Sequence, residues 1–525
     1  MPSDPMPSGQ PLPARVPMLP SPPALESLAA PTQARPALAA HRLMLFFDGG
    51  LFRFVAFIAI TPLLLTALGH SLYGMLAVAT ALVGYLGVAH RGVQEESTRL
   101  VTAARRVGDL GRVRIILASA LAVLGGMGVL LAAGVAAASS SFVTFFGATD
   151  AQVHVCALFL TLEAARAGLT VTAAAWTAGA ESLGQQAHLR AWRGAATLAQ
   201  VAGVLFVVGN GWGLFGLGIV GASAAAFGLV AEGGAAVLPG TRLSWRDVDR
   251  SVVGRLLVAA ALPGAGGAAL VASFDAGILV LAAVVGLEAV AIYAIAAHGC
   301  RLLLGLALHL SGGLYPTFST LALHGDRLQM RWVFRRAMDA TLLTTAGLAL
   351  IAIAFGRPML ELWLGVKQAD GTVAALGVSI LTAAPVVVAG RYAARAGLVR
   401  TVATVAALEA VLCVVLALLL IGPYGTAGVA LAAAAAQLLT GAWYFPMVAC
   451  RHLAISPARF WLARAWRLSI VLGPALIAAI VAVAYKPPRN AKELAVEVGI
   501  VAILYSVSSF AAWYLLETRP ETDAD

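Results

Sequence analysis

Apolar runs of membrane-spanning length recur along almost the whole chain, and they constrain its fold more than any other feature. A transmembrane helix needs roughly 20 mostly apolar residues to cross the hydrocarbon layer. Fourteen such runs predict an all-α polytopic membrane protein, in which Pro263, Gly264, Gly266 and Gly267 interrupt the long seventh run. The runs cover about 44–68, 72–90, 113–134, 153–178, 194–210, 213–237, 256–284, 289–312, 337–356, 373–390, 401–421, 426–448, 468–485 and 493–515.

The composition excludes several other classes of protein. With 60% hydrophobic residues, 11% charged residues and a mean hydropathy of +0.88, the chain is too apolar to be soluble. The net charge of +10 comes from cations spread over many short connections. A protein that binds nucleic acid would gather them in one patch, so no nucleic-acid partner is expected. The four cysteines show no CxxC spacing, and the histidines have no ligand spacing, so neither a metal site nor a cofactor is predicted.

The cations also predict the orientation. If the N-terminus is cytoplasmic, the inside connections hold 27 of the 35 Lys and Arg residues, the outside connections hold five, and three lie inside helices. This asymmetry follows the positive-inside rule. We therefore expect a multi-pass protein of the cytoplasmic membrane with both termini in the cytoplasm.

Composition and spacing divide the chain into five parts. The first contains 11 of the 24 prolines and too little periodic apolar sequence to fold, so it is predicted to be disordered. The predicted parts are a Pro-rich cytoplasmic tail at 1–43, a first six-helix lobe at 44–237, a second at 238–448, a helical pair with its preceding basic loop at 449–515, and a cytoplasmic tail at 516–525.

The two six-helix lobes repeat each other's turn residues. The interval from Gly69 to Gly286 is the same as that from Gly108 to Gly325. Trp212-Gly213 and Gly216 correspond to Tyr424-Gly425 and Gly428, at a slightly shorter interval. An even number of helices separates equivalent points, so this is a parallel repeat and both lobes have the same orientation. Two similar lobes are expected to enclose a central cavity.

These same segments resemble the polysaccharide-biosynthesis flippases of the multidrug/oligosaccharidyl-lipid/polysaccharide (MOP) exporter superfamily. The resemblance is carried by TPLLLTALGHSLYGMLAVATALVGYLG and GDLGRVR in the first lobe, and by GLEAVAIYAIAAHGCRLL, LYPTFSTLALHGDRLQMRWVFRRAM and LELWLG in the second. It extends over most of the chain from about residue 44. It implies two six-helix lobes with two additional C-terminal helices, alternating access, and a polyprenyl-(pyro)phosphate-linked glycan as cargo. Membrane lipids and other polysaccharide-assembly proteins are the further partners it implies.

Ionisable residues at membrane depth are costly, which makes them candidates for function. A guanidinium stays charged and binds phosphate with two N–H groups, so Arg53, Arg166 and Arg301 are predicted to bind the head group of such a cargo. The alternatives are snorkelling or ion pairing for Arg53 and Arg301. For Arg166 the alternative is a pair with Glu163, which precedes it on the same helical face.

Intramembrane carboxylates are the candidates for ion coupling, because burial raises a carboxyl pKa toward neutrality. Asp48 and Glu409 come first, and Glu163 and Asp275 are further cavity carboxylates. For Glu232 an interhelical hydrogen bond is the expected role. The segment 91–114, with six Arg, is predicted to set topology at an anionic leaflet rather than to act as a gate.

Other functions remain open as alternatives. A cation-coupled multidrug exporter of the same superfamily would have twelve helices and excess carboxylate in its cavity. A polytopic glycan polymerase or ligase would need a large outer loop with paired catalytic residues, and every predicted outer connection is short. The lipid II flippase branch ranks below a general saccharide flippase. No GxxxxGK[ST], HExxH or GxSxG motif occurs, so ATP hydrolysis and enzymatic catalysis are not expected.

Overall fold

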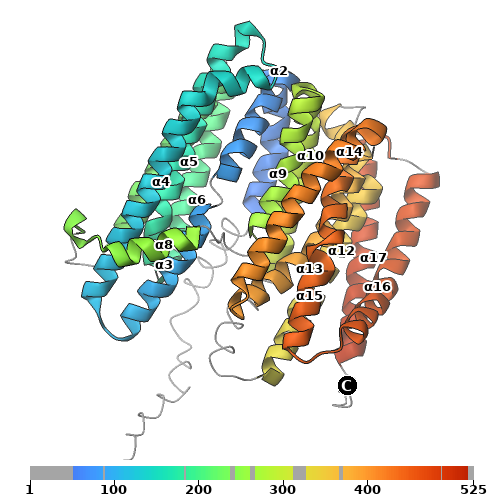
Figure 1. The fold of residues 1–525 in the computed structure, drawn as a ribbon. Helices are drawn as coiled ribbons and strands as arrows, with labels where there is room; N and C mark the ends of the chain where they lie inside the picture. Colours follow the sequence, from blue (N-terminus) through green and yellow to red (C-terminus); the bar gives the residue numbers. More distant parts are fainter. Residues whose placement is uncertain are drawn as a thin grey trace, which may run out of the picture. The chain divides into compact units, whose positions relative to one another are not determined.

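The computed structural model describes residues 51–86, 89–182, 185–236, 243–260, 267–310, 327–365, 371–485 and 488–517. These residues form helices and no strand. Asp48 and the predicted tail at 1–43 lie outside them. The elements are α2 (Leu51–Leu86), α3 (Ala89–Arg106), α4 (Leu110–Phe145), α5 (Asp150–Ser182), α6 (Gln186–Gly209), α7 (Gly213–Ala236), η2 (Trp245–Asp247), α8 (Arg250–Ala260), α9 (Gly267–Val284), α10 (Leu287–Leu310), α12 (Arg327–Leu364), α13 (Thr372–Arg395), α14 (Val399–Leu439), α15 (Gly441–His452), α16 (Pro457–Tyr485) and α17 (Ala491–Glu517) (Figure 1).

Within these residues, eleven helical stretches are long and apolar enough to cross a membrane. Two of them reverse direction at a glycine with a positive φ, Gly69 (73°) and Gly425 (56°). A Cβ on Gly428 would overlap the Leu420 carbonyl oxygen. In a continuous helix these two residues would lie about 12 Å apart, so the chain folds back between them. With the shorter apolar segment of α9, these stretches make up the fourteen predicted spans, and the all-α polytopic fold is confirmed.

Two of the predicted boundaries differ from the structure. Part of the predicted basic loop 91–114 is the helix α3, whose apolar residues face α4 and α5. The first residues of the predicted seventh span, up to Ala260, belong to α8, and α9 begins at Gly267. Sequence hydropathy joined these two helices because α8 ends in an apolar stretch.

The predicted repeat is present in the backbone. Helices α4 and α12 begin at Leu110 and Arg327, and this interval equals the one between the turn glycines Gly69 and Gly286. Gly213 and Gly425 have φ values of 57° and 56°. A positive φ favours glycine because a Cβ would clash with the following peptide. Gly325 lies outside the described residues.

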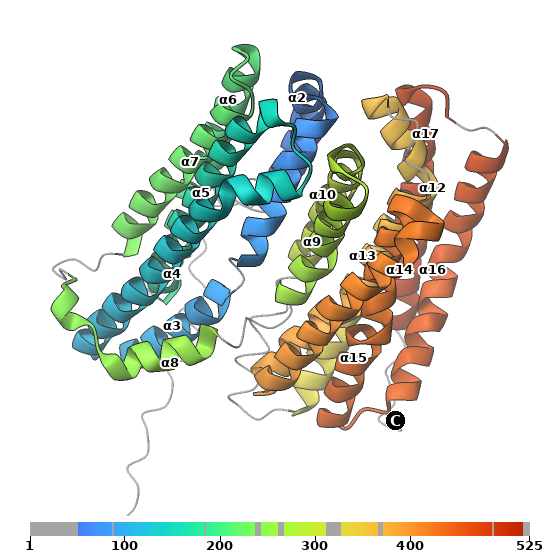
Figure 2. The same cartoon turned by 45° about the horizontal axis from the view of Figure 1, so that its top comes forward.

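The halves of the repeat meet along α2, and the last two helices pack separately. In the first half, α5 packs between α4 and α7; in the second, α13 packs between α12 and α14. Helix α2 packs against α9 and α10 of the second half. Helices α16 and α17 pack against each other and against α12 (Figure 2). This arrangement places the turn glycines and the intramembrane charges of α2, α9 and α10 together.

Candidate functional site

The contact between α2 and α10 brings the two halves together. Gly74 lies directly against the backbone of Leu287, so that a Cβ on Gly74 would overlap the Leu287 carbonyl oxygen. Further along, the ring of Phe57 lies 5.0 Å from that of His298. Trp363 of α12 donates a hydrogen bond of 3.1 Å to the carbonyl oxygen of Ile58. The absence of a side chain at Gly74 is therefore what lets these two helices approach.

Three charged or polar residues lie at a similar depth along this contact. Arg53 and Tyr85 lie at equal sequence distances on either side of Gly69, and Arg301 follows Gly286 at nearly the same distance. At 1.5 Å per residue, each lies about 22–24 Å from its turn. The contacts of Gly74 with Leu287 and of Phe57 with His298 show that both turns are at the same end. Arg53 and Arg301 therefore lie on neighbouring helices at the same level.

Arg301 forms an ion pair with Asp275 across the α9–α10 hairpin. Its Nη1 donates to the Asp275 carboxylate, whose side chain is 5% exposed, whereas the arginine side chain is 30% exposed. Gly84 of α2 approaches the same carboxylate, with its Cβ position 3.6 Å from Asp275 Oδ2. A guanidinium has five N–H donors. The pair thus uses one side of the Arg301 guanidinium and leaves the rest partly accessible.

The other two predicted arginines differ in their surroundings. Arg166 donates to Glu163 through Nε at 2.8 Å and lies 2.6 Å from it through Nη2. The intrahelical pair weighed as the alternative is therefore present. Arg53 is exposed and forms no ion pair within the described part of the chain. The head-group role of all three arginines stays a prediction.

Further polar groups besides Asp275 are buried in the second half. The Tyr293 hydroxyl is fully buried against Gly277 and has no hydrogen-bond partner among the described residues. Cys413 of α14 lies within electrostatic range of Tyr293 and of Glu409. Glu409 is 1% exposed and accepts a hydrogen bond of 3.1 Å from Thr440. Asp275, predicted as a cavity carboxylate, and Glu409, predicted as a coupling residue, are thus two buried carboxyl groups of the second half.

Two ion-pair networks contain charged residues that the sequence reasoning did not connect. Arg193, counted there as a loop cation, donates to Glu232 at 2.9 Å. Thr177 donates to the same carboxylate at 2.5 Å, so the expected interhelical bond of Glu232 is present. The second network, around Asp339, ties α16 to α12.

The Asp339 carboxylate of α12 forms an ion pair with Arg464 of α16, whose Nε lies 3.1 Å away. It also accepts a hydrogen bond of 2.8 Å from Arg467 Nη1 of the same helix. The Arg464 guanidinium also lies 3.5 Å from the centre of the Phe460 ring. Asp339 lies inside a predicted span, and an aspartate at that position was the available signal. Its two partners could not be identified, because they belong to a helix much further along the chain.

No family model matches the chain, and no curated protein matches its sequence. Solved structures do match its fold. The lipid II flippase MurJ in an inward closed conformation matches with a TM-score of 0.66 and 13% identity, over 90% of this chain and 100% of that one. An inward-facing multidrug resistance MATE family transporter of the MOP superfamily matches with a TM-score of 0.60 and 12% identity, over 77% and 95%.

The chain has the fold of MOP-superfamily transporters. A eukaryotic MATE transporter, AtDTX14, also matches with a TM-score of 0.57 and 12% identity, over 82% of this chain and 99% of that one. The predicted resemblance to the superfamily is thereby confirmed at the level of the fold. The repeated turns and the fourteen apolar segments are features of a multi-pass membrane protein with this MOP fold.

Within the residues that the structure covers, no group of three or more His, Cys, Asp or Glu could hold a metal ion. The candidate site of this chain is instead a set of guanidinium and carboxyl groups. Arg53, Asp275 and Arg301 lie at the α2–α10 junction, whereas Glu163 and Arg166 lie on α5 of the first half. Such a set can attract an anion and exchange ion-pair partners, as a binding site for a charged group requires.

Proposed function

We propose that this protein moves a lipid-linked oligosaccharide, or a related polyprenyl-linked glycan, across the cytoplasmic membrane by alternating access. Arg53 and Arg301 at the junction of the two halves would receive the anionic phosphate head group, with Arg166 as a further site. An arginine held at membrane depth lowers the cost of bringing a phosphate out of water, because it pairs with it in a bidentate way. The observation that carries the proposal is the shared depth of Arg53 and Arg301 in the MOP fold.

The C-terminal helical pair favours a lipid-linked cargo. Helices α16 and α17 contain 29 and 27 residues. The match to the flippase MurJ covers 90% of this chain, and the matches to the two MATE transporters cover 77% and 82%. The part of this chain that the MurJ match covers beyond the MATE matches is close in length to this helical pair. The Asp339 network holds the pair against α12.

The buried carboxyl groups of Asp275 and Glu409 are proposed to couple transport to an ion gradient, with Asp48 and Glu163 as further candidates. The proposal places both termini in the cytoplasm and assigns no enzymatic activity to the chain. Other polysaccharide-assembly proteins remain predicted partners.

Replacing Arg53 by alanine is expected to reduce glycan export at least tenfold while the amount of protein stays normal, because an exposed arginine contributes little to folding. Arg53→Lys should retain part of the activity, since it keeps the charge and loses only the bidentate geometry. The measurement is the lipid-linked glycan that accumulates on the cytoplasmic leaflet in cells carrying each variant. Arg357→Ala, which removes another exposed arginine, is the matched control.

A cation-coupled multidrug exporter is the second candidate, which the MATE matches favour. Deletion of the gene separates the two. A flippase predicts accumulation of a lipid-linked glycan with unchanged drug susceptibility, whereas an exporter predicts increased susceptibility with no accumulation. If deletion of the gene causes glycan to accumulate but Arg53→Ala exports glycan normally, the transport function is supported. Arg53 is then not part of the head-group site.

A further inference from the structure

The segment between the two halves, residues 243–260, is fastened to the first half by polar contacts. Asp247 of η2 accepts a hydrogen bond of 2.8 Å from Arg114 of α4. Shortly after it, the Asp249 backbone N–H donates to the Ser119 hydroxyl at 3.0 Å. These contacts join positions far apart in the sequence, so the segment is docked on α4 by interactions of its own.

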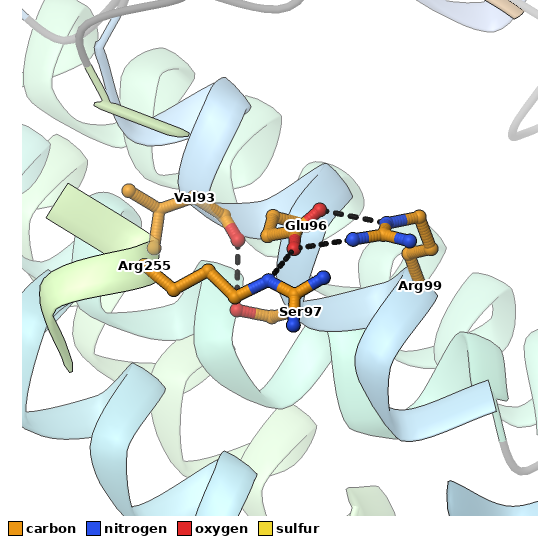
Figure 3. A network of polar contacts seen from close by, with 5 residues as sticks. All are labelled: Val93, Glu96, Ser97, Arg99 and Arg255. Carbon is orange, nitrogen blue, oxygen red and sulfur yellow. Dashed lines mark hydrogen bonds and ion pairs between the residues drawn. The ribbon is translucent and has the colours of Figure 1, made fainter. Parts of the chain in front are cut away.

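Glu96 of α3 makes the third attachment (Figure 3). Its carboxylate accepts hydrogen bonds from Arg99 at 2.7 and 2.8 Å and from Arg255 of α8 at 2.8 Å. Burial alone would raise the pKa of Glu96. The hydrogen bonds and charges of Arg99 and Arg255 outweigh burial and hold its pKa below the usual range of a glutamate.

Helix α8 buries apolar residues against the first half and also exposes large apolar residues. Leu256 is 0% exposed and packs with Val93, Ala120 and Leu124 of the first half. Immediately after it, Leu257 and Val258 are 52% and 65% exposed, and Trp245 at the other end of the segment is 79% exposed. The inward face is thus satisfied by protein, and the outward face presents large apolar side chains that require another environment.

Among the described residues, two exposed arginines in this segment have no carboxylate partner, whereas both aspartates do have partners. Asp247 is used by Arg114, and Asp249 accepts hydrogen bonds from the Ser251 and Val252 backbone N–H groups at the start of α8. Arg246 and Arg250 are exposed and form no ion pair with any residue that the structure describes. The two carboxylates are therefore held by Arg114 of α4 and by the start of α8, and two exposed guanidinium groups remain.

The position of α8 along the chain places this face near a bilayer. Helix α8 has 11 residues, too few to cross a membrane. It ends at Ala260, and the apolar helix α9 begins at Gly267, so the connection spans at most about 25 Å. An exposed Trp, exposed aliphatic residues and arginine together are typical of helices that lie in the headgroup layer.

We propose that residues 245–258 form a binding surface for anionic phospholipid headgroups. Trp245, Leu257 and Val258 enter the boundary between headgroups and acyl chains, and Arg246 and Arg250 pair with the phosphates. Glu96 and Asp247 hold the surface in position. The inference is independent of the proposed cargo, because it concerns the surrounding lipid.

Gly254 offers a site for the test. It is exposed, and no described atom outside its own helical turn lies within 4 Å of its Cβ position. The four native cysteines are buried, so Gly254→Cys can carry a single fluorophore. The full chain is placed in nanodiscs of neutral phosphatidylcholine, or of an equimolar mixture of that lipid with anionic phosphatidylglycerol, each containing a lipid-bound quencher.

We expect anionic lipid to increase quenching at position 254 at least twofold. Arg246→Glu/Arg250→Glu should abolish this increase, because each arginine near an anionic surface contributes roughly a fivefold gain in lipid affinity. Arg489→Glu/Lys492→Glu makes the same change of charge elsewhere and should keep the increase. Equal quenching in both lipids, or an equal loss in both charge-reversal variants, would overturn the proposal.

Glu96 gives a pH dependence to the same measurement. Because its pKa is lowered, its contribution is present above the usual pKa of a glutamate and is lost only as the pH falls through the lowered value. Quenching should therefore stay constant between about pH 5 and 8 and change only in stronger acid. Glu96→Gln should show at neutral pH the quenching that the wild-type protein shows only in strong acid. A transition of the wild-type protein near neutral pH would exclude Glu96 as the positioning group.

Discussion

Replacing Arg301 by alanine is expected to destabilise the protein by about 3–5 kcal/mol and to abolish transport, because Asp275 would remain buried without its partner. An uncompensated buried charge is among the most costly changes a fold can suffer. Thermal unfolding of the purified protein in detergent measures the first effect. Export of lipid-linked glycan by the variant measures the second.

A double variant separates the two roles of Arg301. In Asp275→Asn/Arg301→Gln neither charge remains, so most of the lost stability should return. If Arg301 also binds the head group, transport stays absent in this variant. Recovery of both stability and transport would show that the pair has only a structural role. Asp275→Asn alone keeps the guanidinium, so it should still bind the head group, although loss of the proposed coupling carboxylate should slow transport.

Gly74→Leu is expected to have the second large effect, a loss of about 3 kcal/mol together with loss of transport. Any Cβ at this position overlaps the Leu287 carbonyl oxygen. No side-chain rotamer can relieve a clash with backbone, so α2 and α10 would have to separate. Because this contact joins the two halves, both stability and their relative motion should suffer.

Gly134→Leu is the matched control for Gly74→Leu. Gly134 is also inside a helix, and no described atom outside that helix's own turn lies within 4 Å of its Cβ position. Replacing a helix-interior glycine there should be neutral or stabilise by up to about 1 kcal/mol. Equal unfolding temperatures for the two variants would contradict the close approach of α2 and α10.

The fold was predictable because each membrane-spanning helix is visible as a local run of apolar residues. The repeat was predictable because equivalent turns of the two halves, at Gly69 and Gly286 and at Gly213 and Gly425, need a positive φ, which favours glycine. Helix α3 was missed as a helix because its apolar residues are too few to span a bilayer and were assigned to a loop. Its stability comes from packing on α4 and α5, which no local pattern reports.

The candidate site was predictable only in part. The spacing of Glu163 and Arg166 indicated their pair directly. Asp275 and Arg301 lie on either side of Gly286 at similar sequence distances, so a hairpin at that glycine could have brought them together. Asp339 pairs with Arg464, and Arg255 pairs with Glu96. The partners of each pair are distant in the sequence, and only the folded chain brings them into contact.

Helices α4 and α12 hold equivalent places in the repeat and contain 36 and 38 residues. At 1.5 Å per residue they are about 54 and 57 Å long, nearly twice the thickness of the hydrocarbon layer. Each can therefore act as a lever pivoting near its midpoint. A tilt of about 10° would move either tip by roughly 5 Å while the middle stays almost still, so the proposed alternating access would need only slight rocking at the bilayer centre.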